Sequence, residues 1–89
     1  MYQKRRETDK RYKQAATQQC DDMRKIGAVL RTRRKELGYS QSELAQFCGF
    51  SQRLISEMER GRDTVAINKV MRYANALGID LVLSIRGGI

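Results

Sequence analysis

The side chains best suited to chemistry in this sequence lie between positions 52 and 56. An amide such as that of Gln52 can pair with N6 and N7 of adenine, and a guanidinium such as that of Arg53 can pair with O6 and N7 of guanine. Ser56 follows one helical turn later and shares their face of a helix. We therefore predict that Gln52, Arg53 and Ser56 contact base edges in the major groove of DNA.

A second set of polar residues is better suited to phosphate oxygens. Gln41 opens a helix whose first N–H groups have no partner within the helix, and such helix starts bind anions. The residues expected to contact the DNA backbone are Gln41, Ser51, Arg60 and Arg62. Glu57 can accept from cytosine N4 or stay solvated, and of these two roles we favour the solvated one.

Two short helices joined by a tight turn must position these side chains. Ser40 and Glu43 have the spacing of a capping box, which marks the start of the first helix. Gly49 can adopt the positive φ that ends this helix, and Ser51 can cap the second one, which we expect to end at Arg60. Two short helices joined by a turn that contains glycine form the helix-turn-helix pattern.

The spacing of residue types resembles the Cro/phage-repressor (XRE) type of helix-turn-helix domain over residues 24–79. The matching runs are R-x-x-x-G-x-S-Q-x-x-L-A from Arg34 to Ala45, G-x-S-Q-x-x-I-S-x-x-E-x-G from Gly49 to Gly61, and A-x-x-L-G-I from Ala74 to Ile79. The resemblance implies that the second helix of the motif enters the major groove while the first lies across the backbone. It also implies an ion pair between Arg34 and Glu59, for which a planar guanidinium is well suited.

Helical spacing of apolar residues predicts further helices that pack against this motif. One is capped by Asp21 or Asp22, ends at Gly38 and carries Ile26, Val29, Leu30 and Leu37. Another is capped by Thr64, and its expected apolar stripe is Ile67, Val70, Met71, Ala74 and Leu77. We expect Met58 and Met71 to fill the core rather than to form a binding surface, and Cys48 to be a small buried hydrophobe.

Beyond Gly78 the apolar period changes from that of a helix to that of a strand, which predicts a β-strand over residues 80–86. One face of this strand carries Leu81, Leu83 and Ile85. A lone strand leaves its backbone N–H and C=O groups unpaired. We therefore expect it to pair antiparallel with the same strand of a second copy across a twofold axis.

The predicted fold is mostly α: a Cro/repressor-like helix-turn-helix domain of four to five helices, with one C-terminal β-strand that pairs in a dimer. Residues 1–20 form a basic N-terminal extension, residues 21–79 the DNA-binding domain, and residues 80–89 the dimerisation strand and tail. A chain of 89 residues has room for one domain with a small core.

The charge of the chain favours a polyanionic partner. It has 18 lysines and arginines against 10 aspartates and glutamates, which gives a net charge of +8. The extension over residues 1–20 is basic and polar on nearly all sides. It can be a solvated tail, an arm that touches the DNA backbone, or a helix that docks on a protein.

Enzymatic and metal chemistry have no support in the sequence. The chain has no histidine, and Cys20 and Cys48 lie too far apart in sequence for a CxxC motif. We found none of the common nucleophile, phosphate-loop or zinc motifs, and we predict no enzyme activity, no cofactor and no metal site. No apolar run is long enough to span a membrane and no signal-peptide core is present, so we expect a cytoplasmic, nucleoid-associated protein.

Two functions fit these observations. The short chain and the C-terminal strand are particularly similar to HipB-type antitoxins. That likeness implies a homodimeric repressor of its own operon, bound to a palindromic operator in double-stranded DNA and to a HipA-like kinase toxin. The alternative is a stand-alone phage-type or chromosomal repressor without a toxin partner. The chain departs from HipB antitoxins in its basic N-terminal extension and in its short end after Arg86.

Overall fold

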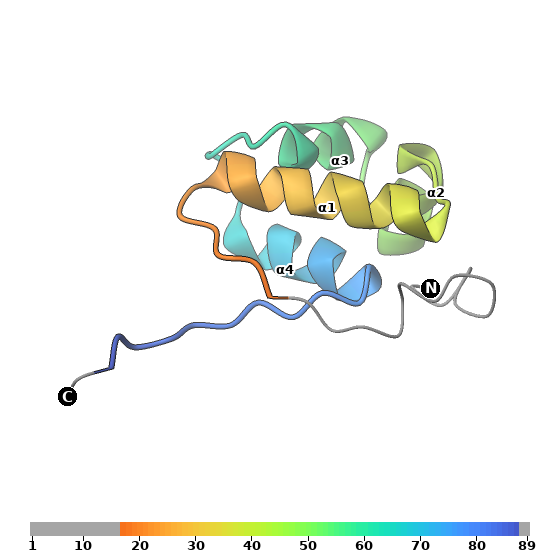
Figure 1. The fold of residues 1–89 in the computed structure, drawn as a ribbon. Helices are drawn as coiled ribbons and strands as arrows, with labels where there is room; N and C mark the ends of the chain where they lie inside the picture. The colour runs from red at the N-terminus through yellow and green to blue at the C-terminus, as the bar shows by residue number, and fades with distance from the viewer. Residues whose placement is uncertain (1–16, 88–89) are drawn as a thin grey trace.

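The computed structural model describes residues 17–87, and this part of the chain contains four α-helices and no β-strand. The helices are α1 (Met23–Leu37), α2 (Gln41–Cys48), α3 (Gln52–Glu59) and α4 (Ile67–Ala76). Figure 1 shows α1 lying across the bundle, with α3 along one side of it and α4 along the other. The mostly α fold predicted from the sequence is confirmed. Most of the predicted extension over residues 1–20, and residues 88–89 of the tail, lie outside the described residues.

Side-chain caps fix where the first three helices begin. Asp22 accepts from the backbone N–H of Lys25, and Ser51 accepts from that of Leu54. At the start of α2 the capping box is complete: the Ser40 hydroxyl accepts from Glu43 N at 3.1 Å, and Glu43 Oε1 accepts from Ser40 N at 2.9 Å. These caps, predicted from residue type and spacing, are confirmed.

The start of α4 differs from the prediction. Its N-cap is Ala66, which makes no side-chain capping bond, so the cap predicted at Thr64 is wrong. The Thr64 hydroxyl instead accepts from Arg62 Nε at 3.0 Å. Helix α4 therefore begins later than expected, after a loop that returns the chain from α3.

Two glycines make the arrangement of the helices possible. Gly49 has φ +74° and ends α2 in the left-handed conformation that turns the chain into α3. Gly27 lies inside α1, where a Cβ atom would stand 2.4 Å from the carbonyl oxygen of Met58 and 2.7 Å from that of Glu59. Helices α1 and α3 thus pack with their backbones in contact, which only glycine at position 27 permits.

The core lies between α1 and the other three helices. Its largest fully buried side chains are Tyr73, Leu30, Leu37, Leu44, Ile55, Met58, Leu77 and Val70. Cys48 is buried among them, as predicted, and is a free thiol. The predicted stripe on α4 is wrong at Ile67 and Met71, which are 63% and 53% exposed. Tyr73 turns the buried face of α4 away from these two residues, so Met58 fills the core and Met71 does not.

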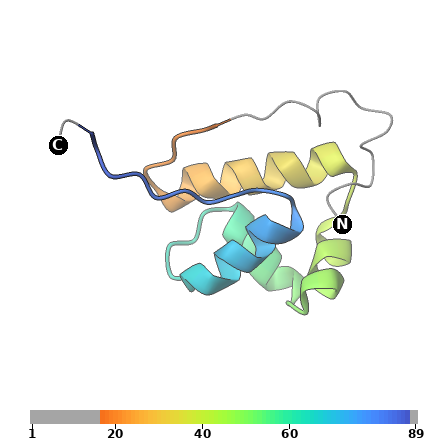
Figure 2. The same ribbon diagram turned by 90° about the horizontal axis from the view of Figure 1, so that it is seen from below.

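The C-terminal segment is extended but unpaired. Figures 1 and 2 show it running past the N-terminal end of α1. Ile79, Asp80 and Leu81 line a shallow hollow against α4, whereas Leu83 is fully exposed and Ile85 is 85% exposed. No strand forms among residues 17–87 because no other described segment pairs with this one. The strand predicted over residues 80–86 needs a second chain and stays a prediction.

Candidate nucleic-acid interface

The first turn of α3 is its exposed end. Ser51, Gln52 and Arg53 are exposed, and the Arg53 side chain retains 82% of its accessible surface. Ser56 is half-buried. Two of the predicted base-reading residues therefore lie in the exposed first turn of α3, and the third, Ser56, follows one turn later and is partly covered.

The last turn of α3 faces inward. Ile55 and Met58 are fully buried, and Glu59 is 6% exposed. The helix ends at Glu59, with Arg60 as its exposed C-cap. A short helix of this kind presents one end to solvent while the other end is fixed in the core.

Glu59 is the acceptor at the centre of a buried polar cluster. Arg34 donates to it through Nε, at 2.7 Å from Oε2, and through Nη2, at 2.9 Å from Oε1. The third donor group of Arg34, Nη1, lies 2.9 Å from the carbonyl oxygen of Tyr39. The ion pair implied by the family resemblance is thus present, bidentate and buried.

Two neutral donors complete the cluster. The Tyr73 hydroxyl donates to Glu59 Oε2, and Gln41 Nε2 donates to Oε1 at 3.1 Å. The acid at the end of α3 is therefore bonded to residues of α1, α2 and α4. Sequence reasoning missed the role of Tyr73; the signal available was a phenol close to the apolar stripe of a short helix, where a buried hydroxyl needs a partner.

The cluster shifts the pKa values of its members. Burial alone raises the pKa of Glu59, but hydrogen bonds from Arg34, Tyr73 and Gln41, together with the Arg34 charge, hold it below the ordinary glutamate value. The pKa of Arg34 is raised, chiefly by its hydrogen bond to Glu59. The pKa of Tyr73 is raised by burial and by its bond to the carboxylate. Near neutral pH the cluster is an ionised pair with a neutral phenol.

Gln41 has a role that sequence reasoning did not anticipate. It was expected to contact phosphate, and in the structure its amide is half-buried and bonded to Glu59. An amide nitrogen carries two N–H groups, so this bond does not exclude a phosphate contact through the second. Gln41 thereby connects the start of α2 to the end of α3.

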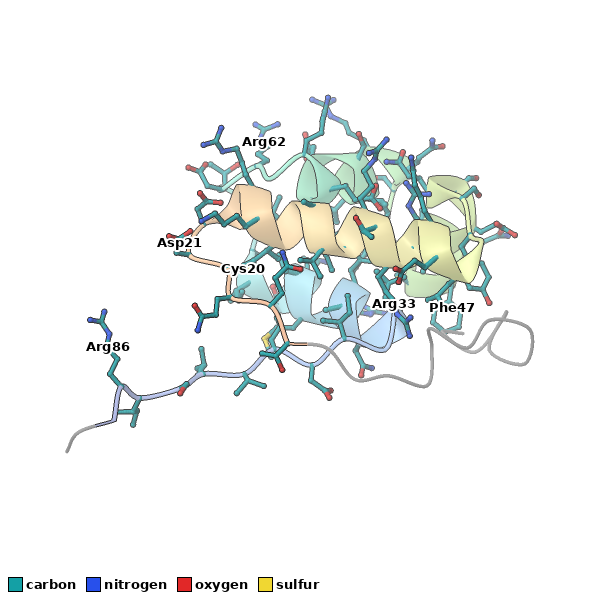
Figure 3. The ribbon with its side chains drawn as sticks, in the orientation of Figure 1. Cys20, Asp21, Arg33, Phe47, Arg62 and Arg86 are labelled. Atoms are coloured by element: carbon teal, nitrogen blue, oxygen red, sulfur yellow. The ribbon has the colours of Figure 1, made fainter. Side chains whose placement is uncertain are left out.

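Glu57 is paired with two arginines and mostly covered, so the prediction of a freely solvated acid is wrong. Its side chain is 15% exposed, and its Oε2 accepts from Arg62 Nη1 at 2.6 Å and from Arg53 Nε at 3.3 Å. Figure 3 shows Arg62 on the α3 side of the molecule, away from the C-terminal segment that carries Arg86. Glu57 therefore lies between two arginines, Arg53 and Arg62, that were predicted to contact DNA separately.

Comparison with known proteins identifies the family. The helix-turn-helix family model (HTH_3) matches residues 30–83, which is more than half of the chain. The chain belongs to the helix-turn-helix family. The matched residues contain all of α2, α3 and α4 and the second half of α1.

Relatives from a bacterium and a phage each match about two thirds of the chain. An uncharacterised HTH-type transcriptional regulator, y4dJ of Sinorhizobium fredii, is 39% identical over 62 residues, which are 68% of this chain and 80% of that protein. The ImmF control region 10 kDa protein of Bacillus phage phi105 is 33% identical over 60 residues, 67% of each chain.

Solved structures share the fold at lower sequence identity. A HipB-O4 20mer complex superposes with a TM-score of 0.72 at 22% identity, and covers 80% of this chain and 100% of that one. A HipA-HipB-O2-O3 complex superposes with the same TM-score of 0.72 at 22% identity, and also covers 80% of this chain and 100% of that one.

In this helix-turn-helix protein, α2 and α3 form the motif, and α3 is the second of its two helices. Phe50 packs in the turn between them, with Lys69 Nζ at 5.2 Å and Arg72 Cζ at 5.3 Å from the centre of its ring. Within residues 17–87, no group of three or more potential metal ligands is present. No helix in that part of the chain is long and apolar enough to cross a membrane.

Proposed function

We propose that this protein is a sequence-specific repressor that binds double-stranded DNA as a dimer. The observation that carries the proposal is the division of α3: Gln52 and Arg53 are exposed at its start, while Glu59 anchors its end in the core. A rigidly held helix with base-compatible side chains at its free end suits insertion into a major groove.

Some of the proposed contacts determine sequence specificity, and others contribute to affinity. Gln52 and Arg53 read base edges, with Ser56 at the margin of the contact. Ser51, Arg60 and Gln41 contribute to the DNA backbone contact, which fixes register without reading sequence. The net charge of +8 supports binding to a polyanion.

The dimer is proposed to form through residues 80–86. Leu83 and Ile85 are exposed on a segment whose backbone has no strand partner within the described chain. Ile67 and Met71 expose further apolar surface on α4, and Met71 lines a hollow together with Ile79 and Leu81 at the start of that segment. Antiparallel pairing of two copies closes both open edges, and a palindromic operator with half-sites about 34–36 Å apart follows from the twofold axis.

DNA recognition is tested by selecting bound sequences from a library of random duplexes, followed by mobility-shift titrations. Gln52→Ala and Arg53→Ala are each expected to weaken the selected site by about 1–3 kcal/mol and to relax preference at one base pair. Gln41→Ala is expected to weaken all sequences more evenly. Unchanged preference in both α3 variants would show that α3 does not read the bases.

The dimer is tested by a chain that ends at Ile79. Sedimentation is expected to find it monomeric, and its affinity for the selected site is expected to fall even though Gln52 and Arg53 are intact. A truncated chain that remains dimeric with full affinity would move the contact to another surface. The matched control is Arg86→Ala, which leaves the apolar face of the segment intact.

For the biological role, we propose an antitoxin of a HipBA-like toxin–antitoxin module that represses its own operon. The supporting observation is the fold shared with HipB, both in its complex with an O4 20mer and in the complex that also contains HipA. A stand-alone repressor is the second candidate, supported by the phage phi105 ImmF control region relative. A kinase-like gene beside this one, whose product co-purifies with this protein and loses toxicity in its presence, favours the antitoxin; a neighbourhood without such a gene favours the stand-alone repressor.

A further inference from the structure

Helix α3 carries a carboxylate on the surface where the proposed function requires DNA to approach. A negative charge there would repel phosphates unless it is compensated within the protein. Glu57 is compensated twice, because Arg53 and Arg62 both donate to its Oε2. The Glu57 side chain is only 15% exposed, so most of its surface is covered by other protein atoms.

The contacts form a continuous chain from the loop after α3 back to its first turn. Thr64 Oγ1 accepts from Arg62 Nε at 3.0 Å, and Arg62 Nη1 in turn lies 2.6 Å from Glu57 Oε2. Glu57 Oε2 then accepts from Arg53 Nε at 3.3 Å. The contact from Arg62 to Glu57 is shorter than the one from Arg53. Arg62 therefore restrains the carboxylate, and the carboxylate in turn restrains Arg53.

The donor used by Glu57 leaves Arg53 able to read a base. A guanidinium has five N–H groups in one plane, and only the one on Nε is directed to Glu57. The four on Nη1 and Nη2 are enough for the bidentate contact with guanine O6 and N7. A bond at Nε also restricts the orientation of the guanidinium plane. A bidentate contact depends on that orientation, and a single phosphate contact does not.

We propose that Glu57 is a positioning residue that sets the base preference of Arg53, with Arg62 as its anchor. This inference rests on the proposed function, because it requires α3 to read DNA. An arginine that is 82% exposed and otherwise unrestrained would lose its side-chain freedom on binding. Ordering the Arg53 side chain before binding reduces that entropy loss for the correct base. It also limits the conformations in which Arg53 could contact other bases.

The test compares base preferences, position by position, for the wild type and four variants on duplexes selected by the wild type. Glu57→Gln keeps the shape of the side chain and removes its charge. Arg53→Ala identifies the base pair that Arg53 reads. Asp63→Asn is the matched control, because it makes the same change of charge at an exposed loop position next to Arg62.

Glu57→Gln is expected to relax the same base pair as Arg53→Ala and to leave the other positions unchanged. Its ratio of specific to non-specific affinity is expected to fall by roughly 2- to 10-fold, the size of the ordering cost of one long side chain. Asp63→Asn is expected to keep the wild-type ratio, with at most a uniform gain in affinity. Arg62→Met, which frees Glu57 from the loop, is expected to relax that base pair as well.

A Glu57→Gln protein with wild-type preference at every position would overturn the proposal. A uniform gain in affinity, as expected for Asp63→Asn, would overturn it too, since the acid would then act only through its charge. If Glu57→Gln does not fold, as judged by circular dichroism, Arg62→Met decides in the same way. Failure of the wild type to select any sequence would instead refute the proposed function, and this inference with it.

Discussion

Replacing Arg34 by methionine is expected to remove much of the stability of the domain. The substitution deletes both hydrogen bonds to Glu59 and the bond from Nη1 to Tyr39. It leaves a carboxylate whose side chain is 1% exposed with only two neutral donors, Gln41 and Tyr73. Removing one partner of a buried ion pair costs about 3–5 kcal/mol. The whole stability of a domain is about 5–15 kcal/mol.

Urea unfolding of wild type and variant measures this loss, at one fixed protomer concentration because the proposed dimer would contribute to stability. Arg31→Met is the matched control: it removes an exposed arginine of the same helix and is expected to change the unfolding free energy by no more than about 0.5 kcal/mol. Adding Glu59→Gln to Arg34→Met is expected to recover part of the loss, because the amide carries no charge and still accepts from Tyr73. A loss of only about 0–1 kcal/mol for Arg34→Met, the value of an exposed pair, would refute the reasoning.

The same pair predicts how stability depends on pH. Because the pKa of Glu59 is lower in the folded protein than the ordinary value of 4.5, its ionised form stabilises the fold. That contribution is complete above pH 4.5 and is lost as the pH falls through the lowered, folded-state pKa. In Arg34→Met, burial without the cation is expected to raise the Glu59 pKa. As the pH falls and the Glu59 carboxyl group of the variant takes up its proton, the difference in unfolding free energy between wild type and variant should therefore become smaller.

Three further outcomes are expected. Gly27→Ala should lower the unfolding free energy by about 1–3 kcal/mol, because the added methyl group would meet the α3 backbone. This loss should exceed the gain of about 1 kcal/mol from the higher helix propensity of alanine. Thermal unfolding measures the change, and a stabilised variant would contradict the close packing. Ser40→Ala should cost about 1 kcal/mol and speed hydrogen exchange at the Glu43 amide, an effect that Ser42→Ala should not reproduce. The logarithm of DNA affinity should fall with that of salt concentration by roughly 0.9 per neutralised phosphate, and removal of residues 1–18 should flatten the slope only if that segment touches DNA.

Local signals predicted much of this fold from the sequence. The caps at Ser40 and Ser51 and the turn at Gly49 depend on a few neighbouring residues, so residue type and spacing were sufficient. The Arg34–Glu59 pair joins residues 25 positions apart, and no local rule indicates it. It came from the resemblance to a family.

The errors concern which way a side chain faces when two directions satisfy the same local pattern. On α4, a stripe through Ile67 and Met71 and one through Tyr73 are both helical, and the buried carboxylate beneath Tyr73 decides between them. Glu57 looked like a surface acid because its partner Arg62 lies beyond the end of the helix, in a loop whose path the sequence does not specify. The cap was wrongly assigned to Thr64 because this residue lies in the same loop.

The division of α3 into an exposed start and a buried end has a consequence for evolution and for engineering. Substitutions at Gln52 and Arg53 alter exposed side chains, so under the proposed function they change which operator is bound without endangering the fold. Substitutions at Ile55 or Glu59 would be eliminated first for instability, whatever DNA they favoured. If α3 reads the operator as proposed, divergent copies of this chain can acquire new regulatory targets through very few mutations. A designer retargeting it should then randomise the first turn of α3 and keep the last turn unchanged.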